Sequence, residues 1–161
     1  MRIRRAEEAD FATLADICVA AYQPFLAATG RYVDQLRDVA TRAAGAELLV
    51  AEDDSRLLGT VTFVPDGGPL GEIARPDETE FRMLAVDPAA QGRGVGSALL
   101  GHVVEESAVR GRAGVVCSTQ PAMRAAHAVY RRAGFERAPE RDWSPVPGVE
   151  LLAFTLRLAR D

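Results

Sequence analysis

Apolar positions recur along this chain with two periods, and each period predicts one kind of element. Phe11, Leu14 and Cys18 lie three and four residues apart, which predicts a helix over 8–22. Similar stripes predict helices over 33–43, 97–110 and 123–133. Short apolar or alternating runs predict strands at 3–6, 47–52, 56–64, 80–86, 114–118 and 149–158.

The order of these elements predicts a mixed α/β fold, in which strands alternate with helices in the second half of the chain. Glycine and proline gather in 65–77 and 139–148, which we interpret as long loops. The sequence contains no repeat, linker or change of composition. We therefore expect a single domain over residues 1–161.

Composition narrows the class of protein. With 161 residues, of which 48% are hydrophobic, the chain can bury a sizeable core. A net charge of −4 argues against a nucleic-acid partner, and no apolar run has the length of a membrane span or a signal peptide. We expect a cytoplasmic protein with no membrane partner. Its two cysteines and two histidines are isolated in the sequence, so we expect buried free thiols and no metal site.

A glycine-rich turn follows the apolar strand that ends at Val86. Gly92, Gly94 and Gly96 alternate with other residues directly before the helix expected at 97–110. Glycines permit positive φ and leave room against the backbone, and a helix N-terminus offers free N–H donors with partial positive charge. Together these features predict a site for a phosphate group.

Two common phosphate motifs do not fit this turn. A P-loop needs Gly-Lys-Ser or Gly-Lys-Thr, which is absent, and a dinucleotide fingerprint needs a glycine where Ser97 stands. The pattern Gln91-x-x-Gly94-x-Gly96 instead resembles the pyrophosphate loop of the GNAT superfamily of N-acetyltransferases, which bind acetyl-coenzyme A. A glycine-rich turn that binds nothing, or a different nucleotide-binding domain, stays as an alternative reading of the loop alone.

A second segment strengthens the resemblance. Residues 126–135 look like the last motif of that superfamily, a helix that carries a tyrosine, Tyr130, and closes in Gly134-Phe135. The similarity extends over nearly the whole chain, including the first strand and the strand 80–86. It implies a largely antiparallel sheet that becomes parallel and splays between 80–86 and 114–118, flanked by about four helices.

The resemblance also implies which residues hold the cofactor. Pantetheine would pair with the backbone of one strand end and the pyrophosphate would lie on the turn. The cofactor-binding residues implied in this way are Leu84, Ala85, Val86, Gln91, Gly92, Arg93, Gly94, Val95, Gly96 and Ser97. One departure concerns Met123, which stands where many relatives have an asparagine that contacts pantetheine. A thioether lacks the paired donor and acceptor of an amide.

Acetyl transfer to an amine needs a base and an acid. Tyr130 matches the tyrosine that protonates the coenzyme A sulfur in the family, and a phenol suits that task. Glu80 matches a frequent position of the base, with Glu72, Asp77, Glu78 or water as alternatives. His127 lies one turn before Tyr130 on a similar helix face, where we expect a surface histidine.

We therefore predict an N-acetyltransferase that uses acetyl-coenzyme A and acts on a primary amine of a small molecule, a peptide N-terminus or a lysine. The alternative is a non-catalytic acyl-coenzyme A sensor on the same fold. The resemblance implies that the acceptor lies among the segment 22–32 and the two long loops. Phe25, Tyr32 and Trp143 are candidate walls. A homodimer is left open.

Overall fold

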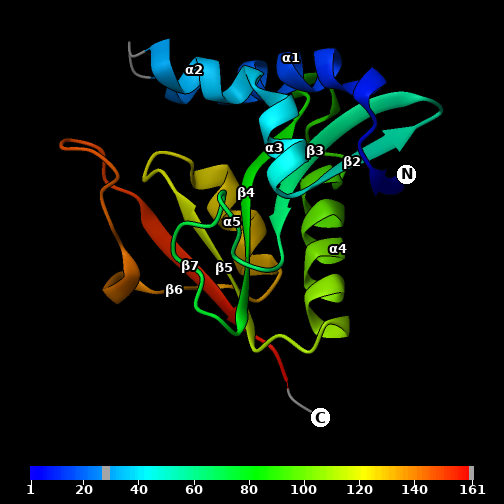
Figure 1. The fold of residues 1–161 in the computed structure, drawn as a ribbon. Helices are drawn as coiled ribbons and strands as arrows, with labels where there is room; N and C mark the ends of the chain where they lie inside the picture. Colours follow the sequence, from blue (N-terminus) through cyan, green and yellow to red (C-terminus); the bar gives the residue numbers. More distant parts are fainter. Residues whose placement is uncertain (27–29, 160–161) are drawn as a thin grey trace.

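A single mixed sheet forms the centre of the molecule (Figure 1). The computed structural model describes residues 1–26 and 30–159, and for residues 30 and 31 it describes the backbone only. The strand order is β1-β2-β3-β4-β5-β7-β6. The strands are β1 (Arg2–Arg5), β2 (Glu47–Asp53), β3 (Arg56–Val64), β4 (Glu78–Val86), β5 (Gly114–Thr119), β6 (Glu136–Arg137) and β7 (Leu152–Arg157).

Helices cover both faces of this sheet. They are α1 (Phe11–Tyr22), α2 (Gly30–Arg37), α3 (Val39–Gly45), α4 (Val95–Val109) and α5 (Arg124–Arg132). One core cluster joins α4 and α5 to the sheet, and a second joins α1, α2 and α3. On β2, Leu49 belongs to the first cluster and Leu48 to the second, as the alternation of a strand buried on both faces requires. No described helix combines the length and apolar character that crossing a bilayer demands.

The predicted splay is present between β4 and β5. These two strands run parallel, and their pairing covers only Glu78 to Phe81 on β4 and Gly114 to Cys117 on β5. Beyond Phe81, β4 continues towards α1 while β5 leans away with β7 (Figure 1). The stretch of β4 that ends at Val86 therefore has no β5 partner along one edge.

A bulge marks the same part of β4. Met83 has a φ of 51°, and the register of β4 against β3 shifts by one residue between Thr60 and Thr62. Phe81 and Met83 consequently belong to cores on opposite faces of the sheet, although residues two apart on a regular strand share a face. The bulge turns the end of β4 at the point where β5 departs.

Two expectations about elements need correction. The helix expected over 33–43 is two helices, because Asp38 leaves the helical conformation and its side chain accepts the Thr41 N–H as the N-cap of α3. The buried Arg42 then donates to the carbonyls of Gln35 and Leu36 at the end of α2. The two-residue strand β6 falls in a segment where the sequence predicts no strand, and it is too short to show a period.

Candidate active site

The glycine-rich turn has the local geometry of an anion site. Asp87 follows β4 and accepts the Ala89 N–H with its side chain, which starts a single 3-10 turn. Gly92 and Gly94 have φ of 80° and 78°, and Gly94 is the N-cap of α4 with no side-chain cap bond. The first N–H groups of a fifteen-residue helix thus meet a turn that only glycine forms without strain.

The three glycines of the turn are not equivalent. A Cβ at Gly92 or Gly94 would meet no atom within 4 Å, so their backbone conformation, and not crowding, requires glycine. Gly96 lies inside α4, and a Cβ there would lie 3.7 Å from Val86 Cγ2, an ordinary contact. The backbone conformation at Gly96 therefore does not itself require glycine. At Gly92 and Gly94 the space beside the backbone is open.

The Arg93 side chain is paired with a carboxylate and is not free to bind a phosphate. Its guanidinium pairs with Asp53 Oδ2 at 3.0 Å, in the turn between β2 and β3. Both side chains are largely exposed, so the ion pair adds little stability. In this conformation the backbone of the turn, rather than the Arg93 side chain, is what the site offers to an anion.

The backbone of Leu84, Ala85 and Val86 lies where β4 has lost its β5 partner. An extended ligand can add to such an edge by main-chain hydrogen bonds, as a further strand would. The side chains of these residues pack into the two cores, so only the backbone serves. This edge and the glycine turn therefore lie next to each other, because the turn follows the end of β4 after a single 3-10 turn.

Glu80 is fully buried, at 0% exposure, which differs from a solvated carboxylate at a strand end. Its Oε1 accepts the backbone N–H groups of Glu72, Ile73 and Ala74 at 3.0, 3.0 and 2.9 Å. Its Oε2 is buried and has no partner. One oxygen of Glu80 therefore anchors the loop before β4, and the other is left for a proton or a ligand.

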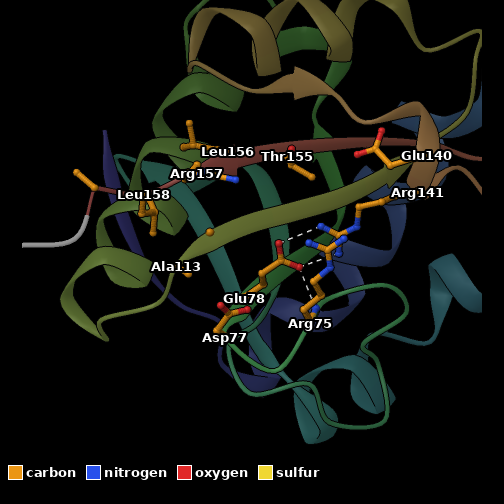
Figure 2. Close-up of a pocket in the computed structure, with 12 residues that line it drawn as sticks. Arg75, Asp77, Glu78, Ala113, Glu140, Arg141, Thr155, Leu156, Arg157 and Leu158 are labelled. Atoms are coloured by element: carbon orange, nitrogen blue, oxygen red, sulfur yellow. Dashed lines mark hydrogen bonds and ion pairs between the residues drawn. The ribbon is translucent and has the colours of Figure 1, made fainter.

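The alternative carboxylates occupy different surroundings. Arg141 binds both oxygens of Glu78 at 2.7 and 2.9 Å, and this pair lowers the pKa of Glu78 although burial opposes it. Glu78 and Asp77 line a groove of about 640 Å³ with Arg75 and Arg157 (Figure 2). That groove adjoins the paired start of β4 and β5, whereas the splay lies past Phe81.

Glu72 has the Glu80 carboxylate among the charged groups that act on it. Burial raises the pKa of Glu72, and the neighbouring Glu80 adds to the rise, while Arg82 lowers it. The Arg82 Nε lies 3.1 Å from Glu72 Oε1. Burial and the Glu80 carboxylate therefore favour the protonated form of Glu72.

Tyr130 lies on α5, and its side chain is buried in the core at 4% exposure. Its ring packs edge-on against Phe81 and Phe154, each with centroids 5.5 Å away. Burial raises the pKa of its phenol well above the ordinary value, and the side chain of Thr119 offsets part of that rise. The phenol therefore stays protonated near neutral pH, and its ring packs against Phe81, the last residue of β4 that pairs with β5.

His127 is not the surface residue that we expected. It is 6% exposed, and its ring lies 5.1 Å from that of Phe154 and 6.2 Å from that of Tyr130. Its Nε2 contacts Thr119 Oγ1 and the Gln120 carbonyl. The sequence contains a usable signal, because Met123, His127 and Tyr130 follow at spacings of four and three, the stripe of a buried helix face.

The candidate acceptor walls come from both sides of the splay. Tyr32 packs edge-on against Tyr22 at 5.9 Å, and Phe25 packs against the core under α1. Trp143 donates from Nε1 to Ser118 Oγ on β5 at 2.9 Å. The segment expected to shape the acceptor site also contains 27–29, which lie outside the described residues. Across 1–26 and 30–159, no three His, Cys, Asp or Glu side chains gather as a metal-binding group.

Comparison with known proteins identifies the family. Residues 11–135 match the sequence model of the Acetyltransferase (GNAT) family. The chain belongs to this family. The matched range contains the glycine turn, Glu80 and Tyr130, and it ends at Phe135 of the second motif.

Relatives of this GNAT protein include mycothiol acetyltransferase of Cellulomonas flavigena, 35% identical over 68% of this chain and 34% of the relative. The chain spans about a third of the length of the curated relatives it matches. Among solved structures, the Escherichia coli ribosomal-protein-S18-alanine N-acetyltransferase aligns with a TM-score of 0.72 at 20% identity, over 99% of this chain and 95% of that one. A Brucella melitensis GNAT acetyltransferase in complex with acetyl-CoA gives 0.62 at 24%, over 99% and 91%.

Proposed function

We propose that this protein is an N-acetyltransferase that moves the acetyl group of acetyl-coenzyme A to a primary amine. The observation that carries the proposal is the parting of β4 from β5 after Phe81. It leaves a free strand edge that leads to the glycine turn, while the buried Glu80 lies on the paired part of β4 and Tyr130 packs against Phe81, the last paired residue. Membership of the GNAT family supports the same activity.

The chain's own backbone would hold the cofactor. The edge at Leu84, Ala85 and Val86 would pair with pantetheine, and the turn from Gln91 to Ser97 would receive the pyrophosphate. The open space at Gly92 and Gly94 and the uncapped start of α4 support this assignment. The Brucella melitensis relative, solved with acetyl-CoA, supports the choice of cofactor. When bound, acetyl-coenzyme A supplies an acetyl group activated as a thioester.

Glu80 and Tyr130 would move the protons. Alkyl amines are mostly protonated at neutral pH and must lose a proton before they attack. The unpartnered Oε2 of Glu80 would accept that proton, directly or through a water molecule. The Tyr130 Oη would donate a proton to the departing sulfur, and backbone amides at the end of β4 would polarise the acetyl carbonyl.

Thiol release in the presence of acetyl-coenzyme A and a panel of amines tests the proposal. The panel should contain small diamines and amino sugars, peptides with a free N-terminus, and lysine peptides, since the named relatives act on different acceptors. We expect release that depends on the amine. Tight binding of acetyl-coenzyme A without release for any class of amine would instead favour the sensor function. The presence of both Glu80 and Tyr130 favours catalysis.

A further inference from the structure

The indole of Trp143 reaches across β7 to the side chain of Ser118 on β5. Trp143 exchanges two backbone hydrogen bonds with Leu151, at 3.1 and 2.8 Å, directly before β7 and on the edge that faces away from β5. Its Nε1 donates to Ser118 Oγ at 2.9 Å. Ala153 of β7 pairs with Ser118 and is 0% exposed. The small side chain of Ala153 therefore leaves room for the indole to cross β7 and to end at β5.

The residue before Trp143 holds this arrangement in place. Asp142 accepts the Ala153 N–H at 2.8 Å, and its two oxygens each accept from Arg137 at 2.8 Å. The indole is thus attached through its own backbone, through the neighbouring Asp142 and through Nε1. Trp143 therefore forms a wall whose position is set by the sheet.

The hydrogen bond from Trp143 decides what the Ser118 hydroxyl can do. An indole N–H only donates, so the Ser118 oxygen is the acceptor. Within residues 1–26 and 30–159, the Ser118 hydroxyl makes no other hydrogen bond. Its hydrogen is left to donate to a bound molecule, because Ser118 is only half-buried. A ligand oxygen that only accepts, such as a carbonyl oxygen, suits this donor.

Ser118 and Glu80 face the same side of the sheet. Their neighbours Cys117 and Phe81 belong to the core with α4 and α5, and successive residues of a strand face opposite ways. Glu80 pairs with Val116, two residues before Ser118, and Cys117 is the last residue of β5 that pairs with β4. Two residues of a strand span about 6.6 Å. Ser118 therefore lies at the parting of the two strands, within reach of a small acceptor whose amine meets Glu80.

We propose that Ser118, oriented by Trp143, is a specificity-determining residue that donates a hydrogen bond to the carbonyl oxygen of an α-aminoacyl acceptor. Such an acceptor is the N-terminus of a peptide or an amino-acid amide. This inference rests on the proposed function and selects one of its acceptor classes. Two carbon atoms separate the amine nitrogen from the carbonyl oxygen in an α-aminoacyl group, so the amine can meet Glu80 Oε2 while the oxygen meets Ser118. The ε-amine of lysine carries no oxygen so close to its nitrogen.

The test removes the oxygen from the acceptor and the hydroxyl from the protein. Alaninamide has the α-amine and the carbonyl, whereas sec-butylamine has a similar shape and no oxygen. We expect the preference in kcat/KM for alaninamide over sec-butylamine to fall about fivefold in Ser118→Ala, the effect of one neutral hydrogen bond. Ser118→Thr keeps the hydroxyl and should keep the preference. Because each amine is compared between variants, the different basicities of the two amines cancel.

Trp143→Phe tests the orienting bond. It removes the Nε1 donor and keeps an aromatic ring, so the hydroxyl stays but loses its fixed direction. We expect the preference for alaninamide to fall about twofold. In a Ser118→Ala background, Trp143→Phe should cause no further loss of preference, because the two residues act as one unit. A further loss of the same size would remove Trp143 from the arrangement.

A second readout needs no turnover. Trp143 is the one tryptophan of the sequence, so its fluorescence reports binding beside Ser118. With coenzyme A present, trialanine amide should change this fluorescence with saturation, and its dissociation constant should be about fivefold higher in Ser118→Ala. N-acetyllysine amide offers only an ε-amine, and its dissociation constant should be the same in both proteins. Comparison of trialanine amide with alaninamide distinguishes a peptide from an amino-acid amide as the better ligand.

The outcomes separate this inference from the proposed function. Absence of thiol release with every amine would overturn the proposed function and this inference with it. Amine-dependent release, with an equal loss for alaninamide and sec-butylamine in Ser118→Ala or no loss for either, would overturn this inference alone. The same holds if trialanine amide leaves the fluorescence of Trp143 unchanged. Thermal unfolding identifies misfolding, and Ser118→Cys, whose thiol is a weak donor, replaces Ser118→Ala if the latter fails to fold.

Discussion

The glycine turn and the buried polar side chains Glu80, Thr119, His127 and Tyr130 are built in opposite ways. The turn lies within six residues of sequence, is mostly exposed, and offers backbone N–H groups. These four side chains come from β4, β5 and α5, and each of them is almost completely buried. A site for a phosphate can be made from local conformation alone. A site that moves protons needs side chains whose surroundings the whole fold supplies.

This contrast makes Gly94→Glu the most damaging change for cofactor binding. The glutamate would place a negative charge at the start of α4 and force a residue with a side chain into a φ of 78°. We expect calorimetry to show acetyl-coenzyme A binding weakened by about a hundredfold or more.

Gly101→Glu is the matched control for Gly94→Glu. Gly101 lies on the same helix, where a Cβ meets no atom within 4 Å and φ is ordinary. This variant should bind as the wild type does. Equal binding by folded Gly94→Glu and Gly101→Glu would show that the turn is not the anion site.

Glu80→Gln tests the buried side chains through the unpartnered Oε2 of Glu80. We expect turnover to fall roughly 10²–10⁴-fold if Glu80 is the base. The defect should shrink as pH rises, because more of the amine is then already neutral. Amide hydrogen exchange at Glu72, Ile73 and Ala74 shows whether the loop stays attached, since a glutamine oxygen can still accept their N–H groups.

Glu78→Gln serves as the control for Glu80→Gln. Glu78 lies two residues away on β4, and its carboxylate is engaged by Arg141 and the Arg75 N–H. This change should weaken the loop but leave most of the turnover. A pH-independent loss of only a few-fold in Glu80→Gln would transfer the base role to Glu72 or to water.

Tyr130→Phe should have a smaller effect on turnover. Thiolates leave fairly well unaided, so we expect a loss near the low end of the acid–base range, about 10²-fold. Cofactor affinity and stability should change little, because the ring keeps its packing against Phe81 and Phe154. Steady-state kinetics with calorimetry measures both. Weakened cofactor binding with kcat intact would assign Tyr130 to the binding half of the site.

The smallest expected effect concerns the free energy of unfolding and how it changes with pH. An unfolded histidine binds a proton below about pH 6.5, whereas buried His127 resists protonation because its pKa is lowered. The native state is therefore fully stabilised above about pH 6.5 and loses stability as pH falls below it. Urea unfolding at several pH values should show this slope in wild type and not in His127→Gln. Glu72, whose raised pKa acts in the opposite sense at lower pH, is common to both proteins. Identical slopes would contradict the burial of His127.

The two regions also differ in what the sequence could predict. The strand, turn and start of α4 follow from local pattern, and Gly92 and Gly94 have the positive φ that the glycines indicated. The splay after Phe81 came from the family resemblance. The anchor on Glu80 could not be predicted locally, because its partners lie in a loop that only the fold places beside it. The burial of His127 did have a local signal, the helical spacing of Met123, His127 and Tyr130. The break at Asp38 was hidden because α2 and α3 each continue the apolar stripe.

The three N–H groups that meet on one oxygen of Glu80 have a consequence for variation between relatives. Backbone groups hold the loop before β4 in place. Its N–H groups donate to Glu80, and Arg141 donates to the Ile73 carbonyl at 2.7 Å. Side chains at Glu72, Ile73 and Ala74 are not needed for these attachments. Substitutions at Ile73 and Ala74 should therefore leave the position of the loop unchanged, whereas Glu72 also pairs with Arg82 through its side chain.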